Sequence, residues 1–207
     1  MGHVTIQLLK GERSEMAELQ RVIEDAPTYA ELVTGLPPGP ADAQSTYTIL
    51  PEGKFYKDKF VLGAYRWGTM VGFADLIRGY PDPTTAYLGV LVISEKHQRR
   101  GIGRAVFELL EGLVRSWGTC DRIRLAVVRT NERVVPFWES LGFEATGETK
   151  PVSVRLGGLR AHPVREAVEV ARCPAGRCRC PRPAAGRRAI AARIRGAASA
   201  PERGPRA

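Results

Sequence analysis

The stretch YLGVLVISEKHQRRGIG, residues 87–103, is the most informative part of the chain because it joins an apolar segment to a glycine-containing turn. Its first seven residues are mostly apolar and rich in β-branched side chains, which predicts a buried strand. After the turn, apolar residues recur at the spacing of one helical face: Val106, Leu109, Leu110, Leu113, Val114 and Trp117. The sequence therefore predicts a strand, a sharp turn and an amphipathic helix.

The turn has the properties of an anion site. Gly101 and Gly103 permit backbone angles, or a close approach, that a Cβ would prevent. The first N–H groups of a helix lack internal acceptors, and the helix dipole places positive charge there. A diphosphate satisfies both conditions, and Arg99, Arg100 and Arg104 add charge that neutralises phosphate oxygens. The turn therefore predicts a pyrophosphate cradle.

Two other phosphate-binding signatures are absent. The Rossmann fingerprint requires a third glycine where this chain has Val106, and a Walker loop requires Gly-Lys followed by Ser or Thr. What remains is the pattern Gln/Arg-x-x-Gly-x-Gly, which begins at Gln98.

This pattern resembles motif A of the GNAT superfamily, the acyl-CoA N-acyltransferases. A second block resembles motif B: residues 122–128 have a strand pattern, Asn131 follows, and Leu-Gly-Phe ends the block at residues 141–143. The resemblance implies an α/β fold with a mixed, mostly antiparallel central sheet and helices on both faces. It implies one acyltransferase domain over residues 1–170, with motif A at about 86–117 and motif B at about 122–146.

The resemblance also implies acetyl-CoA as cosubstrate, with no metal. The backbone at Leu91 and Val92 would pair with the pantetheine amides, and Asn131 would lie near the pantetheine arm, flanked by Phe137 and Trp138. The diphosphate would be held by the turn, whose residues are Gln98, Arg99, Arg100, Gly101, Ile102, Gly103 and Arg104.

Some of these residues have equally good structural interpretations. Asn131 is also a suitable helix N-cap, Gly142 a suitable helix end, and Phe137 a suitable core residue. Many family members have Tyr at the position of Trp138, where the phenol protonates the departing thiolate. An indole N–H cannot act as such an acid, so another group or water is expected to supply that proton.

The general base is less evident, because residues 85–93 contain no carboxylate. Asp75, inside a predicted strand at 70–77 that forms a hairpin with residues 60–66, and Tyr87 are the candidate catalytic residues. Their alternatives are a hydrogen-bonded buried Asp and a packing Tyr. The Pro- and Gly-rich residues 35–54 predict either an acceptor-recognition loop or a plain surface segment.

These observations predict an N-acetyltransferase that moves an acyl group, expected to be acetyl, directly from acetyl-CoA to a primary amine of a small molecule or peptide. The alternative is a non-catalytic acyl-CoA-binding module of the same fold. A homodimer is compatible with the sequence, which does not select the acceptor.

A net charge of +9 is compatible with nucleic-acid binding, but the excess positive charge is confined to the end of the chain. Residues 1–170 contain 21 basic and 21 acidic side chains, whereas residues 171–207 contain ten Arg and one Glu. No nucleic-acid partner is therefore expected for the folded domain. The Ala-, Arg-, Pro- and Gly-rich tail at 171–207 is predicted to be disordered, as either a genuine basic arm or a product of a shifted reading frame.

No apolar run reaches membrane-spanning length and no signal-peptide pattern is present, so a cytoplasmic location is expected, without membrane partners. Three of the four cysteines lie in the tail, and His162 is the only nearby histidine, so no metal site is predicted.

Overall fold

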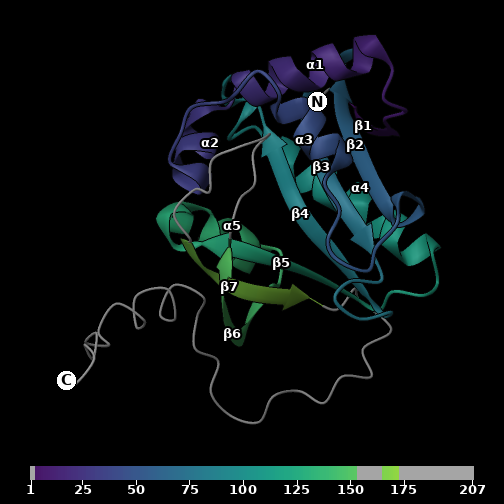
Figure 1. Cartoon of the computed structure of the whole chain (residues 1–207), viewed down its shortest axis with the longest axis vertical. Helices are drawn as coiled ribbons and strands as arrows, with labels where there is room; N and C mark the ends of the chain where they lie inside the picture. The colour runs from purple at the N-terminus through teal and green to yellow at the C-terminus, as the bar shows by residue number, and fades with distance from the viewer. Residues whose placement is uncertain (1–2, 153–164, 173–207) are drawn as a thin grey trace.

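The structure, a computed structural model, describes residues 3–152 and 165–172. Within these residues it contains one seven-stranded sheet of order β1-β2-β3-β4-β5-β7-β6 (Figure 1). Helices pack on both of its faces, so the predicted mixed, mostly antiparallel α/β fold is confirmed. The predicted disorder at 171–207 falls almost wholly outside the described residues, which end at Arg172.

Four consecutive strands form the first half of the sheet. β1 (Val4–Leu8), β2 (Lys59–Arg66), β3 (Thr69–Arg78) and β4 (Thr85–Ile93) are antiparallel neighbours in that order. β1 lies at the edge of the sheet, and β2 and β3 form the predicted hairpin, which turns at Trp67.

The second half contains the one parallel pair among the described strands, β4 with β5 (Arg122–Val128). β6 (Glu144–Val152) forms the far edge, and β7 (Arg165–Arg172) inserts between β5 and β6, antiparallel to both. β7 extends two residues beyond the domain end expected from the sequence, because Arg172 still pairs with Ile123. Its guanidinium also lies 3.0 Å from a carboxylate oxygen of Glu111.

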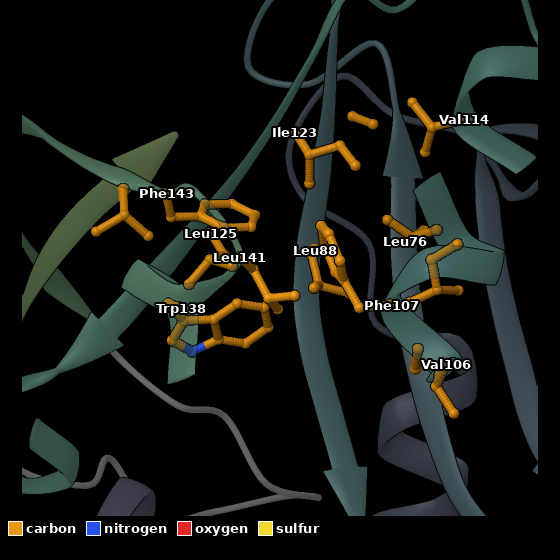
Figure 2. Packing of buried hydrophobic residues seen from close by; sticks show 14 of the residues in the cluster. Leu76, Leu88, Val106, Phe107, Val114, Ile123, Leu125, Trp138, Leu141 and Phe143 are labelled. Atoms are coloured by element: carbon orange, nitrogen blue, oxygen red, sulfur yellow. The ribbon is translucent and has the colours of Figure 1, made fainter. Parts of the chain in front are cut away.

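One face of the sheet is covered by α4 (Ile102–Ser116) and α5 (Val135–Ser140), whose apolar side chains merge with those of the strands (Figure 2). The predicted α4 face is correct except at Leu109, which is 36% exposed, while Phe107 is fully buried. At 100° per residue, Phe107 lies nearer than Leu109 to the centre of a stripe that contains Val106, Leu110 and Val114.

The opposite face is covered by α1 (Arg13–Glu24), α2 (Pro27–Thr34) and α3 (Asp42–Thr48). α1 begins after Glu12, which forms a capping box with Glu15. α3 lies inside the segment 35–54 that was predicted to be a loop. Ala43 of α3 belongs to the same buried apolar cluster as the core residues of α1. The Pro- and Gly-rich composition of the segment does not reveal this tertiary contact.

Candidate active site

The centre of the site is the point where β4 and β5 separate. The two strands pair at only three positions, Thr85 to Tyr87 of β4 against Arg122 to Arg124 of β5. Beyond them β4 pairs only with β3, and β5 only with β7, and the two strands diverge in Figure 1. One edge of β4 from Leu88 onward, including Leu91 and Val92, therefore has no strand partner among the described residues and can pair with an extended ligand.

A β-bulge marks the same stretch of β4. Asp75 faces Val90 and Leu76 faces Leu88, so Gly89 is the extra residue. Bulges re-aim side chains and often lie beside active sites. A Cβ built on Gly89 would lie 3.6 Å from Oδ2 of Asp75, which places this carboxylate directly beside the bulge.

The turn before α4 has an unusual backbone. Arg99 has φ of 59° and Gly101 has φ of 75°, so a left-handed residue that is not glycine lies two positions before a left-handed glycine. Such conformations cost free energy and are concentrated at functional sites. The N–H groups of Ile102, Gly103 and Arg104 have no acceptor within the described parts of the chain. The turn therefore presents free amides at a helix start, as a diphosphate requires.

The predicted cradle side chains have different surroundings. Gln98 Nε2 donates to the carbonyl of Ile93 at 2.8 Å and so fastens the turn to the end of β4. Arg104 donates to Ser140 Oγ at 2.9 Å. The side chains of Arg99 and Arg100 are exposed.

Gly103 faces Phe137 of α5. A Cβ at Gly103 would lie 3.5 Å from the ring of Phe137, which is an ordinary van der Waals distance, so packing alone does not require glycine here. Phe137 thus lies beside the turn, with its ring centroid 4.9 Å from that of Trp138.

Trp138 is buried in an aromatic cluster. Its ring makes edge contacts with Phe107 and Phe143, and Figure 2 shows its indole inside the core that also contains Leu125 and Leu141. The C-terminal end of α5 explains part of this packing. Gly142 has φ of 83°, and the amide of Phe143 donates to the carbonyl of Trp138, which is the helix-ending geometry predicted from Leu-Gly-Phe.

Asn131 does not cap α5, so that interpretation is wrong. The chain first forms a short 3-10 segment, η3 (Arg129–Val134), and α5 begins four residues after Asn131 with Val134 at its N-cap. Asn131 is buried, and its Oδ1 accepts a hydrogen bond from Arg133 Nε at 3.3 Å. Its contact with the pantetheine arm stays a prediction.

The face of the sheet opposite α4 carries the first candidate catalytic group, Asp75 of β3. Asp75 Oδ2 lies 2.7 Å from Nζ of Lys59, and the side chains of Lys59 and Asp75 are only 3% and 14% exposed. Asp75 Oδ1 is buried and has no hydrogen-bond partner within the described residues. Burial raises the pKa of Asp75, and Lys59 opposes this rise. Burial and the nearby charge of Asp75 raise the pKa of Tyr29, on α2, to about 12.

Tyr87, the second candidate, lies on the same face and pairs with a residue that the sequence did not single out. Its Oη donates to Oε1 of Glu169 at 3.1 Å, and Glu169 is buried on β7 with Arg124 Nε 3.7 Å from its other oxygen. Burial and the charge of Glu169 raise the pKa of Tyr87 far above its usual value. Tyr87 is therefore a neutral phenol at neutral pH.

Glu169 was not among the candidate residues selected from the sequence. The available signal was a single acidic residue, Glu169, inside an otherwise buried apolar run. Such a residue in a strand requires a partner.

Two further patterns, a membrane-spanning helix and a cluster of metal ligands, would indicate other kinds of site. None of the helices there is long and apolar enough to cross a membrane. No group of three or more His, Cys, Asp or Glu side chains gathers there in a way that would hold a metal ion.

Comparisons with known proteins agree with this geometry. The profile described as Acetyltransferase (GNAT) family matches residues 26–143. A curated relative, the spermine/spermidine N(1)-acetyltransferase of Bacillus subtilis (strain 168), is 27% identical over 113 residues, which cover 51% of this chain and 72% of that relative.

Solved structures show the same fold. An acetyltransferase from Thermus thermophilus superposes with a TM-score of 0.60 at 23% identity, covering 84% of this chain and 99% of that one. An aminoglycoside 6'-N-acetyltransferase complexed with coenzyme A superposes with a TM-score of 0.59 at 17% identity, covering 84% and 99%. The fold, the turn before α4 and the family match together show that this chain belongs to the Acetyltransferase (GNAT) family and is an acyl-CoA-dependent N-acyltransferase.

Proposed function

We propose that this enzyme transfers an acetyl group from acetyl-CoA directly to a primary amine of a small molecule or peptide. The observation that carries the proposal is the arrangement around Gly89. On one side β4 has an edge without a strand partner in the described residues that leads to the free amides of the α4 turn, and across the bulge lies the buried carboxylate of Asp75. A donor and an acceptor can therefore approach β4 from different sides and meet at the bulge.

The donor side suits acetyl-CoA. Leu91 and Val92 would offer main-chain groups to the pantetheine amides, and the amides of residues 102–104 would hold the diphosphate. The exposed Arg99 and Arg100 would add charge next to the phosphates. A backbone N–H at the Leu91–Val92 step would polarise the thioester carbonyl.

The acceptor side suits an amine. An amine is mostly protonated at neutral pH and must lose a proton before it attacks a thioester. We assign that proton to Asp75, the carboxylate beside the bulge. Tyr87 is unsuited as a base because its pKa is raised, so we assign it a hydrogen-bonding role towards the reacting groups. The buried indole of Trp138 supplies no acid.

Two relatives indicate the range of acceptors. One is a spermine/spermidine acetyltransferase and another an aminoglycoside acetyltransferase. Both names describe substrates with several amino groups. We therefore place polyamines and amino sugars first among the acceptors to be tested, ahead of amino acids and peptide N-termini.

The test is a thiol-release assay with acetyl-CoA and a panel of these amines, combined with calorimetric titration of coenzyme A. We expect heat on titration and release of thiol with at least one amine class. Binding without thiol release from any amine would instead support the non-catalytic acyl-CoA-binding module. Absence of binding heat would overturn both.

A further inference from the structure

The buried pair of Lys59 and Asp75 is unusual for a structural ion pair. Burying two charges is costly, and such pairs are normally surrounded by hydrogen bonds that satisfy their remaining atoms. Here Oδ2 of Asp75 is the only hydrogen-bond partner of Lys59 Nζ among the described residues. Asp75 Oδ1 has none in the same part of the chain. The pair is therefore under-satisfied, which suggests a role other than stabilisation.

The positions of Lys59 and Asp75 in the sheet indicate the role of the pair. Lys59 and Val61 lie on the same face of β2, and Val61 is the direct cross-strand partner of Asp75, so Lys59 reaches Asp75 along the diagonal. On the other side of Asp75, the bulge residue Gly89 has no side chain. Lys59 thus approaches Asp75 from β2, while the β4 side is left clear for a ligand.

Few other groups influence this carboxylate. Within the described residues, Lys59 of β2 is the titratable group that acts on Asp75, and Asp75 in turn acts on Tyr29 of α2. Tyr29 is a neutral phenol, because its pKa is about 12. Lys59 is therefore the single positive charge in the described residues that opposes the effect of burial on Asp75.

We propose that Lys59 is a positioning residue for acyl transfer, whose buried ammonium keeps Asp75 ionised and fixed in orientation beside Gly89 so that Asp75 can accept the proton of the acceptor amine. This inference rests on the proposed function. It adds a residue of β2, a strand outside both family motifs, to the acid–base machinery. Lys59 itself exchanges no proton in this scheme and contacts no substrate.

The first test measures the ionisation of Asp75 without substrate. In Lys59→Met the carboxylate is buried without a counter-charge, so its pKa rises. Carbon-13 NMR of the side-chain carboxyl groups, with Asp75→Asn to assign the signal, should show the Asp75 midpoint at least about one pH unit higher than in the wild type. Lys59→Arg should stay close to the wild type, because it keeps the charge.

The second test is the pH profile of kcat/KM. We expect the ascending limb to move to higher pH in Lys59→Met by the same amount as the NMR midpoint, and to disappear in Asp75→Asn. A merely structural role for Lys59 would lower kcat/KM equally at every pH. The matched control is Lys54→Met, which removes another partly buried lysine, 3.6 Å from Asp58, and should leave the limb in place.

A double variant keeps the proposal testable if Lys59→Met does not fold. Lys59→Met with Asp75→Asn removes both charges and leaves neither unpaired. Because Lys59 acts only through Asp75, the double variant should have the same kcat as Asp75→Asn within about twofold, the agreement expected for full coupling.

Two results would overturn the proposal. One is a further loss of about tenfold in the double variant relative to Asp75→Asn. Another is an unchanged Asp75 midpoint in Lys59→Met or, if that variant does not fold, a midpoint in Lys59→Arg that is about one pH unit or more above that of the wild type. Failure of the wild type to acetylate any amine would overturn the proposed function and leave the NMR result to decide the role of Lys59.

Discussion

The two sides of β4 present different kinds of chemical group to a ligand. On the donor side, next to the turn before α4, the site consists of main-chain groups. These are the strand edge beyond Tyr87 and the free amides of residues 102–104. On the acceptor side, it consists of buried and partly buried polar side chains from four strands, namely Lys59, Asp75, Tyr87 and Glu169. A main-chain site depends on local backbone angles, whereas a side-chain site depends on strand register.

This difference determines which substitutions disrupt each side of the site. A main-chain site tolerates most substitutions except those that change a required φ, since the amides remain whatever the side chain is. A buried side-chain site fails when one member is removed, because its partner is then left without compensation. The two sides should therefore respond to mutation in separable ways.

The largest effect should come from the acceptor side. Asp75→Asn removes the proton acceptor but keeps the shape of the side chain. We expect kcat to fall about 100-fold, the lower end of the range for loss of a general base. The dissociation constant of acetyl-CoA, measured by calorimetry, should change by less than about twofold, because Asp75 does not contact the donor side. Unchanged turnover would remove Asp75 from the mechanism.

A smaller effect, on the affinity for coenzyme A rather than on kcat, should come from the donor side. Gly101→Ala places a Cβ on a residue with φ of 75° and costs roughly 1–2 kcal/mol in that conformation. If the turn relaxes to avoid this strain, the affinity for coenzyme A falls about tenfold, since about 1.4 kcal/mol corresponds to a factor of ten. The measurement is calorimetric titration of each variant, and kcat at saturating acetyl-CoA should stay near the wild-type value.

The control for this prediction is Gly118→Ala, which follows α4 and has φ of 68° with open space around it. It introduces comparable strain outside the site. We expect a similar loss of stability without loss of affinity. Equal effects of both variants on affinity would mean that the α4 turn does not hold the diphosphate.

Tyr87→Phe should have a moderate effect on the acceptor side. It removes the phenol that donates to Glu169 Oε1, and the loss of one buried hydrogen bond costs about 1–2 kcal/mol. Denaturant unfolding should report this loss, and kcat should fall by less than in Asp75→Asn. If kcat falls as far as in Asp75→Asn, Tyr87 takes part directly in proton transfer.

The smallest effect concerns stability as a function of pH. The pKa of Asp75 is raised in the folded protein by burial, so the native state binds this proton more tightly than the unfolded state. The associated stability is fully present below the unfolded-state pKa and is lost as the pH rises through the folded-state pKa. Unfolding free energies measured across this window should decline with pH more in the wild type than in Asp75→Asn. Parallel curves would show that Asp75 is not perturbed.

Much of the donor side could be predicted from the sequence because its signals are local. The β-branched run, the glycines at 101 and 103 and the helical periodicity after them lie within about thirty residues of one another, and together they specify a strand, a turn and a helix. The errors on this side were local as well. Asn131 lies within the 3-10 segment η3 rather than at the start of α5, and its own backbone leaves the helical region.

The acceptor side could be predicted only in part. Asp75 and Tyr87 were selected because a polar residue in an apolar strand requires an explanation, but their partners were not identified. Lys59 lies just before the predicted hairpin strand at 60–66, and Glu169 lies 82 residues from Tyr87 in the chain. Neither pairing has a sequence signature, since each depends on which strands become neighbours and in which register.

The order of the amino acids was thus enough to specify the family, the strand–turn–helix unit and the main-chain groups that suit a diphosphate, because backbone conformation follows largely from nearby residues. Three features required the folded chain: the insertion of β7 between β5 and β6, the bulge of β4 at Gly89, and the contact between Lys59 and Asp75. The energy of a buried charge depends on its immediate neighbours in space, and folding brings those neighbours from distant parts of the chain.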